Sequence, residues 1–117
     1  MAKVYSLPTS NNSDSLTDFK EKLLREHKNN LIILVDRYVE KLEEYGFQIN
    51  QKFKKDSLKK INKELYELRP IPARLFLYFD GNNFFIILHG FVKKVQKTPR
   101  GEIKKAMEEI KRWKTSK

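Results

Sequence analysis

The first 27 residues of the chain comprise, in order, a strand-like stretch, a polar stretch and a series of apolar positions at helical spacing. Residues 3–7 are compatible with a short strand, and residues 8–14, rich in Asn and Ser, predict a loop. A helix is predicted over residues 15–27, because its apolar side chains recur every three to four positions. Ser15 followed by Asp18 approximates the capping box that begins many helices.

A second helix is predicted over residues 31–45, and Gly46 is placed as its C-terminal cap. The apolar run 31–35 is also compatible with a buried strand, but the periodicity continues to residue 45 and favours a helix. This helix should fold back on the first as a hairpin. Residues 47–63 form a basic connection, which three apolar side chains should pin to the core: Phe53, Leu58 and Ile61.

From residue 65 the hydrophobic period changes to two, which is typical of β-strands. Strands are predicted over residues 65–69, 73–79 and 84–92. Residues 80–83, Asp-Gly-Asn-Asn, form a tight connection, so the last two strands make a hairpin. The first two strands are joined by a few residues and should also be antiparallel neighbours. The sequence therefore predicts an antiparallel meander of at least three strands.

Alternation within the strands predicts which side chains share a face. In the second strand Arg74, Phe76 and Tyr78 lie on one face, and the residues between them lie on the other. We expect one face to be core and the other to be a mixed cationic and aromatic surface. His89, near the end of the third strand, should lie among apolar neighbours on its own face. These neighbours are Phe85, Ile87 and Phe91.

The C-terminal segment predicts a final helix that packs on the sheet. Thr98 would supply the N-cap hydroxyl and Pro99 would occupy the first helical position. The apolar stripe of this helix consists of Ile103, Ala106, Met107, Ile110 and Trp113. We expect a single α+β domain over residues 1–117, with an N-terminal helical hairpin and a C-terminal helix on an antiparallel sheet.

The composition limits the kinds of site that the protein can contain and the compartment in which we expect it. The chain of 117 residues contains no cysteine, which excludes disulfides and thiolate metal sites, and its histidines are His27 and His89. The first residues lack the apolar core of a signal peptide, and no apolar run approaches the ~20 residues of a membrane span. We therefore expect a cytoplasmic protein that uses no metal or cofactor and does not contact a membrane.

The charge is strongly positive. Lys and Arg number 25 against 15 Asp and Glu, which gives a net charge of +10. Residues 91–117 carry ten Lys or Arg and three Glu, a net charge of +7. Such an excess predicts an anionic partner, either nucleic acid or an acidic protein. The alternative is a lysine-rich, solvated surface without a specific partner.

Strand pairing should bring a set of cationic and aromatic side chains together on the sheet. The set is Arg69, Arg74, Tyr78, His89, Lys93, Lys94, Lys97 and Arg100. Such a cluster suits metal-free cleavage of RNA, in which the 2′-hydroxyl attacks the adjacent phosphate. Cations would stabilise the transition state, while one group removes a proton and another supplies one to the leaving oxygen. An imidazole or a lysine crowded by other cations suits these proton transfers.

Four of these side chains also have a structural interpretation. Arg69 and Arg74 could pair with Glu67 or with carboxylates of the helices. His89 could be a satisfied histidine at the end of a strand, and Tyr78 a half-buried aromatic of the sheet. The spacing alone does not decide between these alternatives.

Several segments of the second half, taken together with their spacing, resemble HigB toxins of the RelE/ParE superfamily, of the phage-derived type. They are residues 65–70 (Leu-Tyr-Glu-Leu-Arg-Pro), 73–76 (Ala-Arg-Leu-Phe), 88–94 (Leu-His-Gly-Phe-Val-Lys-Lys), 96–99 (Gln-Lys-Thr-Pro) and 102–103 (Glu-Ile). The resemblance covers roughly residues 65–113, and a weaker likeness extends over residues 45–58.

The resemblance implies a compact RelE-like fold and a bacterial toxin that cleaves mRNA, commonly during translation on the ribosome. It also implies a cognate antitoxin, HigA-like and usually carrying a helix-turn-helix, bound in a toxin–antitoxin hetero-oligomer. The catalytic surface would be formed by Arg69, Arg74, His89, Lys93 and Lys94. Contacts with RNA or the ribosome would come from Tyr78, Lys97 and Arg100.

Within the catalytic set, Arg69 and Arg74 would bind the phosphate, and His89, Lys93 or Lys94 would transfer protons. On this hypothesis Arg74→Ala should abolish toxicity and leave the fold intact. Two other functions remain open. A toxin of the ParE branch would inhibit DNA gyrase without catalysis, and a basic RNA-binding module would bind RNA without turnover.

Overall fold

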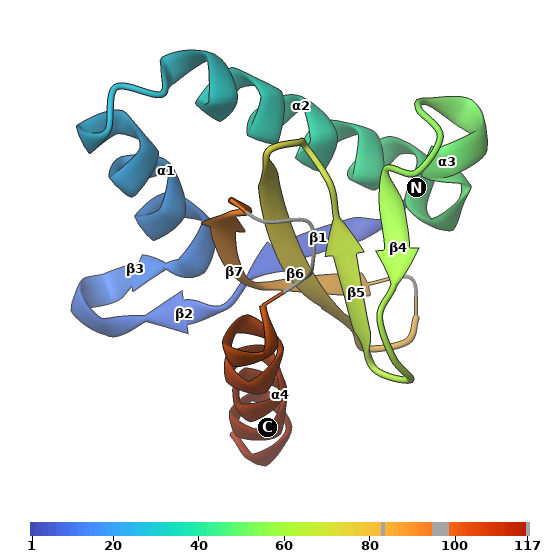
Figure 1. Ribbon diagram of the computed structural model, residues 1–117. Coiled ribbons are helices and arrows are strands. Elements are labelled where there is room, and N and C mark those ends of the chain that lie inside the picture. The colour runs from blue at the N-terminus through green and yellow to red at the C-terminus, as the bar shows by residue number, and fades with distance from the viewer. Residues whose placement is uncertain (83, 95–98, 117) are drawn as a thin grey trace.

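The computed structural model describes residues 1–82, 84–94 and 99–116 and has an α+β architecture, with helices packed on a mostly antiparallel five-stranded sheet (Figure 1). The strands of this sheet are β1 (Lys3–Ser6), β4 (Leu58–Lys60), β5 (Leu65–Leu68), β6 (Ala73–Phe79) and β7 (Phe84–Val92). They follow the order β1, β7, β6, β5, β4 across the sheet. Strand β1 runs parallel to β7, whereas the other neighbours are antiparallel. The α+β class and the meander of the three predicted strands are confirmed.

The helices cover both faces of the sheet. They are α1 (Ser15–Arg25), α2 (Asn29–Tyr45), α3 (Ile49–Lys52) and α4 (Arg100–Thr115), with 3-10 turns η1 (Ser10–Asn12) and η2 (Gly46–Gln48). Helices α1 and α2 form the predicted hairpin on one face, and α4 packs on the opposite face (Figure 1). Across the described residues, no helix has both the length and the apolar character needed to cross a membrane.

The N-terminal region differs from the prediction in two details. The expected loop at residues 8–14 contains a small antiparallel hairpin of β2 (Pro8–Thr9) and β3 (Ser13–Asp14). Helix α1 is capped by Asp14, whose carboxylate accepts a hydrogen bond from the Thr17 amide at 2.9 Å. The hydroxyl of Ser15 instead donates to the carbonyl of Ile87 in the sheet, so the predicted capping box is wrong.

The basic connection at residues 47–63 contains a strand that the sequence did not predict. Strand β4 pairs with β5, so that Leu58 lies opposite Leu68. Of its three residues Leu58 alone is buried, and the two lysines that follow are exposed, which is why no apolar alternation marks this edge strand. The expectation that Phe53, Leu58 and Ile61 contact the core is confirmed.

Helix α4 begins one residue later than predicted. Pro99 occupies the N-cap position with an extended backbone (φ −63°, ψ 130°), so Arg100 is the first helical residue. Thr98, the predicted cap, lies outside the described residues. The apolar stripe is confirmed, since all five of its side chains are buried or half-buried against the sheet.

Both faces of the sheet are buried, which overturns the expected cationic and aromatic surface. Leu75 and Leu77 pack against α1 and α2. On the other face Phe76 is fully buried under α4, and Arg74 is 6% exposed. The alternation of β6 was therefore interpreted correctly. One of its faces was assigned to solvent because the sequence predicted that the final helix packs on the sheet but not which face it covers.

An irregularity in β7 changes the direction of His89. Phe76 of β6 pairs with His89, but the next residue, Leu77, pairs with Ile87, so Leu88 is an extra residue in β7. Such a bulge interrupts the alternation of side chains. His89 consequently contacts residues of the α4 face, together with the predicted neighbour Phe91. The other two predicted neighbours, Phe85 and Ile87, belong to the opposite core, so that part of the prediction is wrong.

Gly90, directly after His89, allows α1 to approach the sheet. A Cβ atom at Gly90 would lie 2.4 Å from Cδ2 of Phe19 and 2.8 Å from Cδ2 of Leu75. Both neighbours are fixed in the core, so Gly90→Ala is expected to lower the free energy of unfolding by about 1–3 kcal/mol. Denaturant titration of the purified variant measures this change.

Gly101 provides the matched control, because a Cβ atom there meets nothing within 4 Å. Gly101→Ala should be neutral or stabilise α4 slightly, by up to about 1 kcal/mol, through its higher helix propensity. Equal stability of Gly90→Ala and the wild type would contradict the close packing of α1 on β7.

Candidate functional site

His89 lies between two carboxylates of α4. Its Nδ1 is 2.5 Å from Oε1 of Glu109, and its Nε2 is 3.0 Å from Oε1 of Glu102. The side chains of His89 and Glu109 are buried, whereas that of Glu102 is one-third exposed. Each nitrogen–oxygen contact requires one proton, so the three groups together hold two protons and carry one net negative charge. We call these three residues the Glu–His–Glu chain.

The residues of the Glu–His–Glu chain come from distant parts of the sequence. The bulge in β7 turns the imidazole toward α4, where it lies nearly perpendicular to the Phe76 ring at a centroid distance of 5.6 Å. Glu102 and Glu109 are seven residues apart, which is two helical turns, so both face the sheet from α4. The apolar contacts of Ala106 and Ile110 hold that helix in place.

A second polar group occupies the same face of the sheet. Glu67 of β5 is 1% exposed, and its Oε1 lies 3.4 Å from Nε of Arg69 and 3.8 Å from Nε of Arg74. These are the ion pairs with Glu67 that the sequence left open. We call the three residues the Arg–Glu–Arg cluster; two guanidinium groups share one carboxylate, so it carries a net positive charge.

Burial affects the electrostatics of this cluster. Desolvation lowers the pKa of the Arg74 guanidinium; the Glu67 carboxylate opposes this effect and the Arg69 charge adds to it. One amino group of Arg74 donates to the carbonyl of Ala73 at 3.1 Å. Within the described part of the chain, Oε2 of Glu67 and Nε of both arginines are buried without a hydrogen bond. The cluster therefore retains unsatisfied polar atoms.

The two groups are neighbours on the sheet. Strands β5, β6 and β7 are adjacent, with Glu67 opposite Phe76 and Phe76 opposite His89. Arg74, two residues before Phe76, lies opposite Phe91 of β7. The structure therefore brings Arg69, Arg74 and His89 to one face of the sheet, separated by the rings of Phe76 and Phe91.

The other predicted site residues lie at different distances from this face. Lys93 follows β7, is half-buried and donates its amide to the carbonyl of Pro72 at 2.9 Å. Lys94 and Arg100 are exposed, Arg100 at the start of α4. Tyr78 lies at the opposite end of β6, where the ammonium of Lys114 is 5.5 Å from its ring centroid. Lys97 lies outside the described residues.

The prediction from the sequence did not include carboxylates as members of the site. Glu67 was considered as an ion-pair partner, but Glu102 and Glu109 were not among the candidates. A signal for them exists, because two acidic residues seven positions apart interrupt the apolar stripe of a helix expected to pack on the sheet. Within the described residues, no group of three or more His, Asp or Glu side chains is arranged to hold a metal ion.

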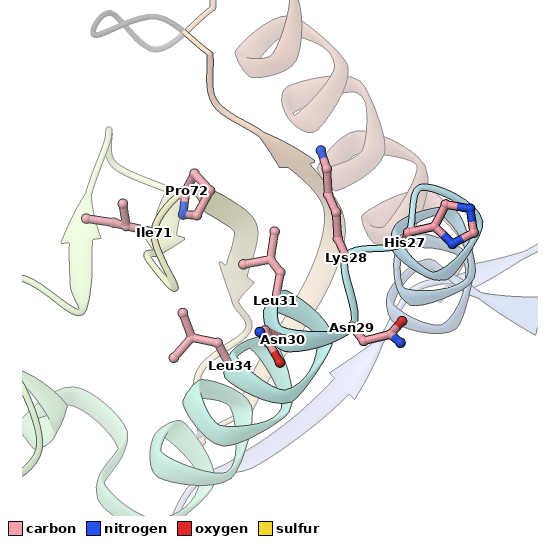
Figure 2. A pocket seen from close by; sticks show the side chains of 8 residues that line it. All are labelled: His27, Lys28, Asn29, Asn30, Leu31, Leu34, Ile71 and Pro72. Atoms are coloured by element: carbon pink, nitrogen blue, oxygen red, sulfur yellow. The ribbon is translucent and has the colours of Figure 1, made fainter.

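A surface hollow of about 690 Å³ lies elsewhere, between the start of α2 and the turn that joins β5 to β6 (Figure 2). Leu31, Leu34, Ile71 and Pro72 form its apolar walls, and the imidazole of His27 is directed away from Ile71 and Pro72. None of the predicted site residues lines this hollow. It lies on the α2 side of the sheet, so we assign it no part in the chemistry of the α4 face.

Most of the chain matches a known protein family. A family model described as "Phage derived protein Gp49-like (DUF891)" matches residues 24–111. The matched span contains all the residues of both the Arg–Glu–Arg cluster and the Glu–His–Glu chain. No curated protein matches the chain.

Proposed function

Since the chain belongs to the phage-derived Gp49-like family, a RelE/HigB-type family of toxin–antitoxin toxins, we propose that it is a HigB-like endoribonuclease that cleaves mRNA on the ribosome. In this reaction the 2′-hydroxyl attacks the adjacent phosphate and the 5′-oxygen leaves. One observation carries the proposal: Arg69, Arg74 and His89 share a face of the sheet at the end where the chain continues into Lys93 and Lys94.

The Arg–Glu–Arg cluster would bind the phosphate whose charge increases in the transition state. The side chain of Arg69 is 22% exposed and that of Arg74 is 7% exposed, so Arg69 is the more accessible of the two. Glu67 holds both guanidinium groups in place, and a fixed cation in a partly desolvated site stabilises an oxyanion more than a mobile one in water. The Nε atoms of both arginines are buried beside Glu67, so a phosphate would contact the exposed part of the Arg69 guanidinium.

Proton transfer would involve His89, Lys93 or Lys94, as the sequence suggested. The lysines provide ammonium groups at the strand end, where Lys94 is exposed. Contacts with the backbone of the mRNA or with ribosomal RNA would come from Lys97 and Arg100, and from Tyr78 for RNA that extends along α4 toward its C-terminus. Lysines of this kind contribute affinity that falls with salt concentration.

The family also implies an antitoxin partner. We propose that it is HigA-like, carries a helix-turn-helix and forms a hetero-oligomer with this chain. The net charge of +10 supports binding of an acidic segment. Such a segment would both reduce the repulsion among the lysines and block the access of RNA.

The experiment that tests the function is induction of the chain in bacteria, followed by mapping of RNA 5′ ends. We expect growth arrest and new mRNA ends clustered within codons of translated regions. Double-strand DNA breaks without new RNA ends would instead indicate a gyrase inhibitor. Salt-dependent RNA binding without new ends, even with translating ribosomes, would indicate a binding module. Either result would reject the endoribonuclease.

A further inference from the structure

The Glu–His–Glu chain runs from the protein interior to its surface. The side chains of Glu109 and His89 are 7% and 8% exposed, and that of Glu102 is 33% exposed. Both nitrogens of His89 are engaged by carboxylates, so its imidazole cannot reach a substrate hydroxyl unless Glu102 moves away. Glu102 is therefore the member of the chain that solvent, or an RNA strand, can contact in this structure.

We propose that Glu102 is the general base of the nuclease and that His89 and Glu109 are positioning residues. This inference rests on the proposed function and assigns the proton acceptor that the sequence left open. Oε1 of Glu102 is the atom held by Nε2 of His89, so a proton can be accepted at its other oxygen, Oε2. A carboxylate also needs no prior deprotonation at neutral pH, whereas a lysine ammonium must first lose a proton.

The surroundings of Glu102 suit this role. It lies in the first turn of α4, so the helix backbone fixes the point from which its side chain extends. His89 fixes the orientation of its carboxylate, and the buried Glu109 fixes the orientation of His89 through the 2.5 Å contact. Such preorganisation is what distinguishes a catalytic carboxylate from one on a mobile surface side chain.

Oε2 of Glu102 accepts the proton of the 2′-hydroxyl, and the resulting oxygen nucleophile forms a bond to phosphorus. The bond between phosphorus and the 5′-oxygen breaks, and its electron pair stays on that oxygen, which takes a proton from the ammonium of Lys93 or Lys94. The products are a 2′,3′-cyclic phosphate and a 5′-hydroxyl. Water then takes the proton from Glu102 and returns one to the lysine.

The test is Glu102→Gln, assayed with purified toxin on ribosomes that translate a defined mRNA. Gln keeps an oxygen that accepts from His89, but its amide cannot act as a base. We expect the single-turnover cleavage rate to fall at least about 100-fold. The ribosome concentration at half-maximal rate and the melting temperature should change little, because the contact with His89 is preserved.

Two further variants separate catalysis from structure. Glu108→Gln removes an exposed carboxylate next to Glu109 on the same helix and should cleave at the wild-type rate. Glu102→Ala should be inactive and regain part of its rate when formate is added, since a small carboxylate can replace the missing base. A merely structural Glu102 would give no rescue by formate.

The outcomes distinguish this inference from the function on which it rests. Glu102→Gln within about threefold of the wild-type rate, or an inactive Glu102→Ala that formate does not restore, would overturn the assignment of Glu102 while leaving the nuclease intact. A wild-type protein that cleaves no mRNA on the ribosome would overturn the proposed function and this inference together.

Discussion

His89→Ala is expected to lower the free energy of unfolding by about 3–5 kcal/mol and to abolish toxicity. The variant leaves the buried carboxylate of Glu109 without the imidazole that lies 2.5 Å away. Glu102 is partly exposed and can turn to solvent, so most of the cost arises at Glu109. Denaturant titration gives the change in stability, and growth after induction gives the change in toxicity.

A double variant separates the two effects. His89→Leu combined with Glu109→Met removes both buried polar groups and replaces them with apolar side chains of similar volume. We expect it to recover most of the lost stability, because no buried charge remains unpaired. It should stay non-toxic, since nothing holds Glu102 in place. A toxic double variant would show that the Glu–His–Glu chain contributes only to the stability of the fold.

The second histidine is the matched control for this experiment. His27 is exposed and has a positive φ of 59°, a conformation that Asn tolerates well. His27→Asn should therefore keep both wild-type stability and toxicity. A single His89→Ala variant as stable as this control would contradict the buried contact with Glu109.

Arg74→Ala is expected to abolish toxicity and also to lower the free energy of unfolding by about 2–3 kcal/mol. The sequence predicted an intact fold for this variant, but Arg74 is 6% exposed and pairs with a carboxylate that is 1% exposed. Its removal leaves Glu67 with Arg69 as its ion-pair partner among the described residues. Part of any loss of toxicity would then reflect the fold and not the chemistry.

Arg74→Lys and a paired variant resolve that ambiguity. Lysine keeps the positive charge beside Glu67 but lacks the planar fork of donors, so we expect a smaller loss of stability and a large loss of cleavage. Glu67→Gln with Arg74→Gln removes both charges and should fold without restoring activity. RNA end mapping and denaturant titration measure both effects.

Arg25→Ala, at the exposed end of α1, is the control and should remain as stable and as toxic as the wild type. Full toxicity of Arg74→Ala would remove Arg74 from the site.

Regular elements were predicted well wherever the local pattern was strong. Strands β6 and β7 have the predicted bounds, and the bounds of α2 differ by two residues at one end. These segments combine long apolar periodicity with clear ends, such as Gly46 after α2, whose φ is 54°. Strand β4 was missed because a single buried leucine produces no hydrophobic periodicity. The strand forms because it can pair with the edge of β5.

The sequence indicated the basic residues of this face and one carboxylate partner, Glu67, but not the two glutamates beside His89. Arg69, Arg74 and His89 do share one face of the sheet, as expected from strand pairing. The burial of Arg74 and His89 was not foreseen, because the position of α4 over that face depends on contacts between residues far apart in the chain. The carboxylates that surround them come from β5 and from α4, and their distances depend on how those elements dock.

The sequence by itself determined most of the elements, the class of the fold and the basic side chains at the end of β7, because these follow from local periodicity, turn residues and alternation within strands. Only the tertiary structure decided that both faces of the sheet are buried and that His89 turns toward Glu102 and Glu109. The physical reason is the extra residue in β7: a bulge depends on the register of two paired strands, which no local pattern records, and it reverses every side-chain direction beyond it.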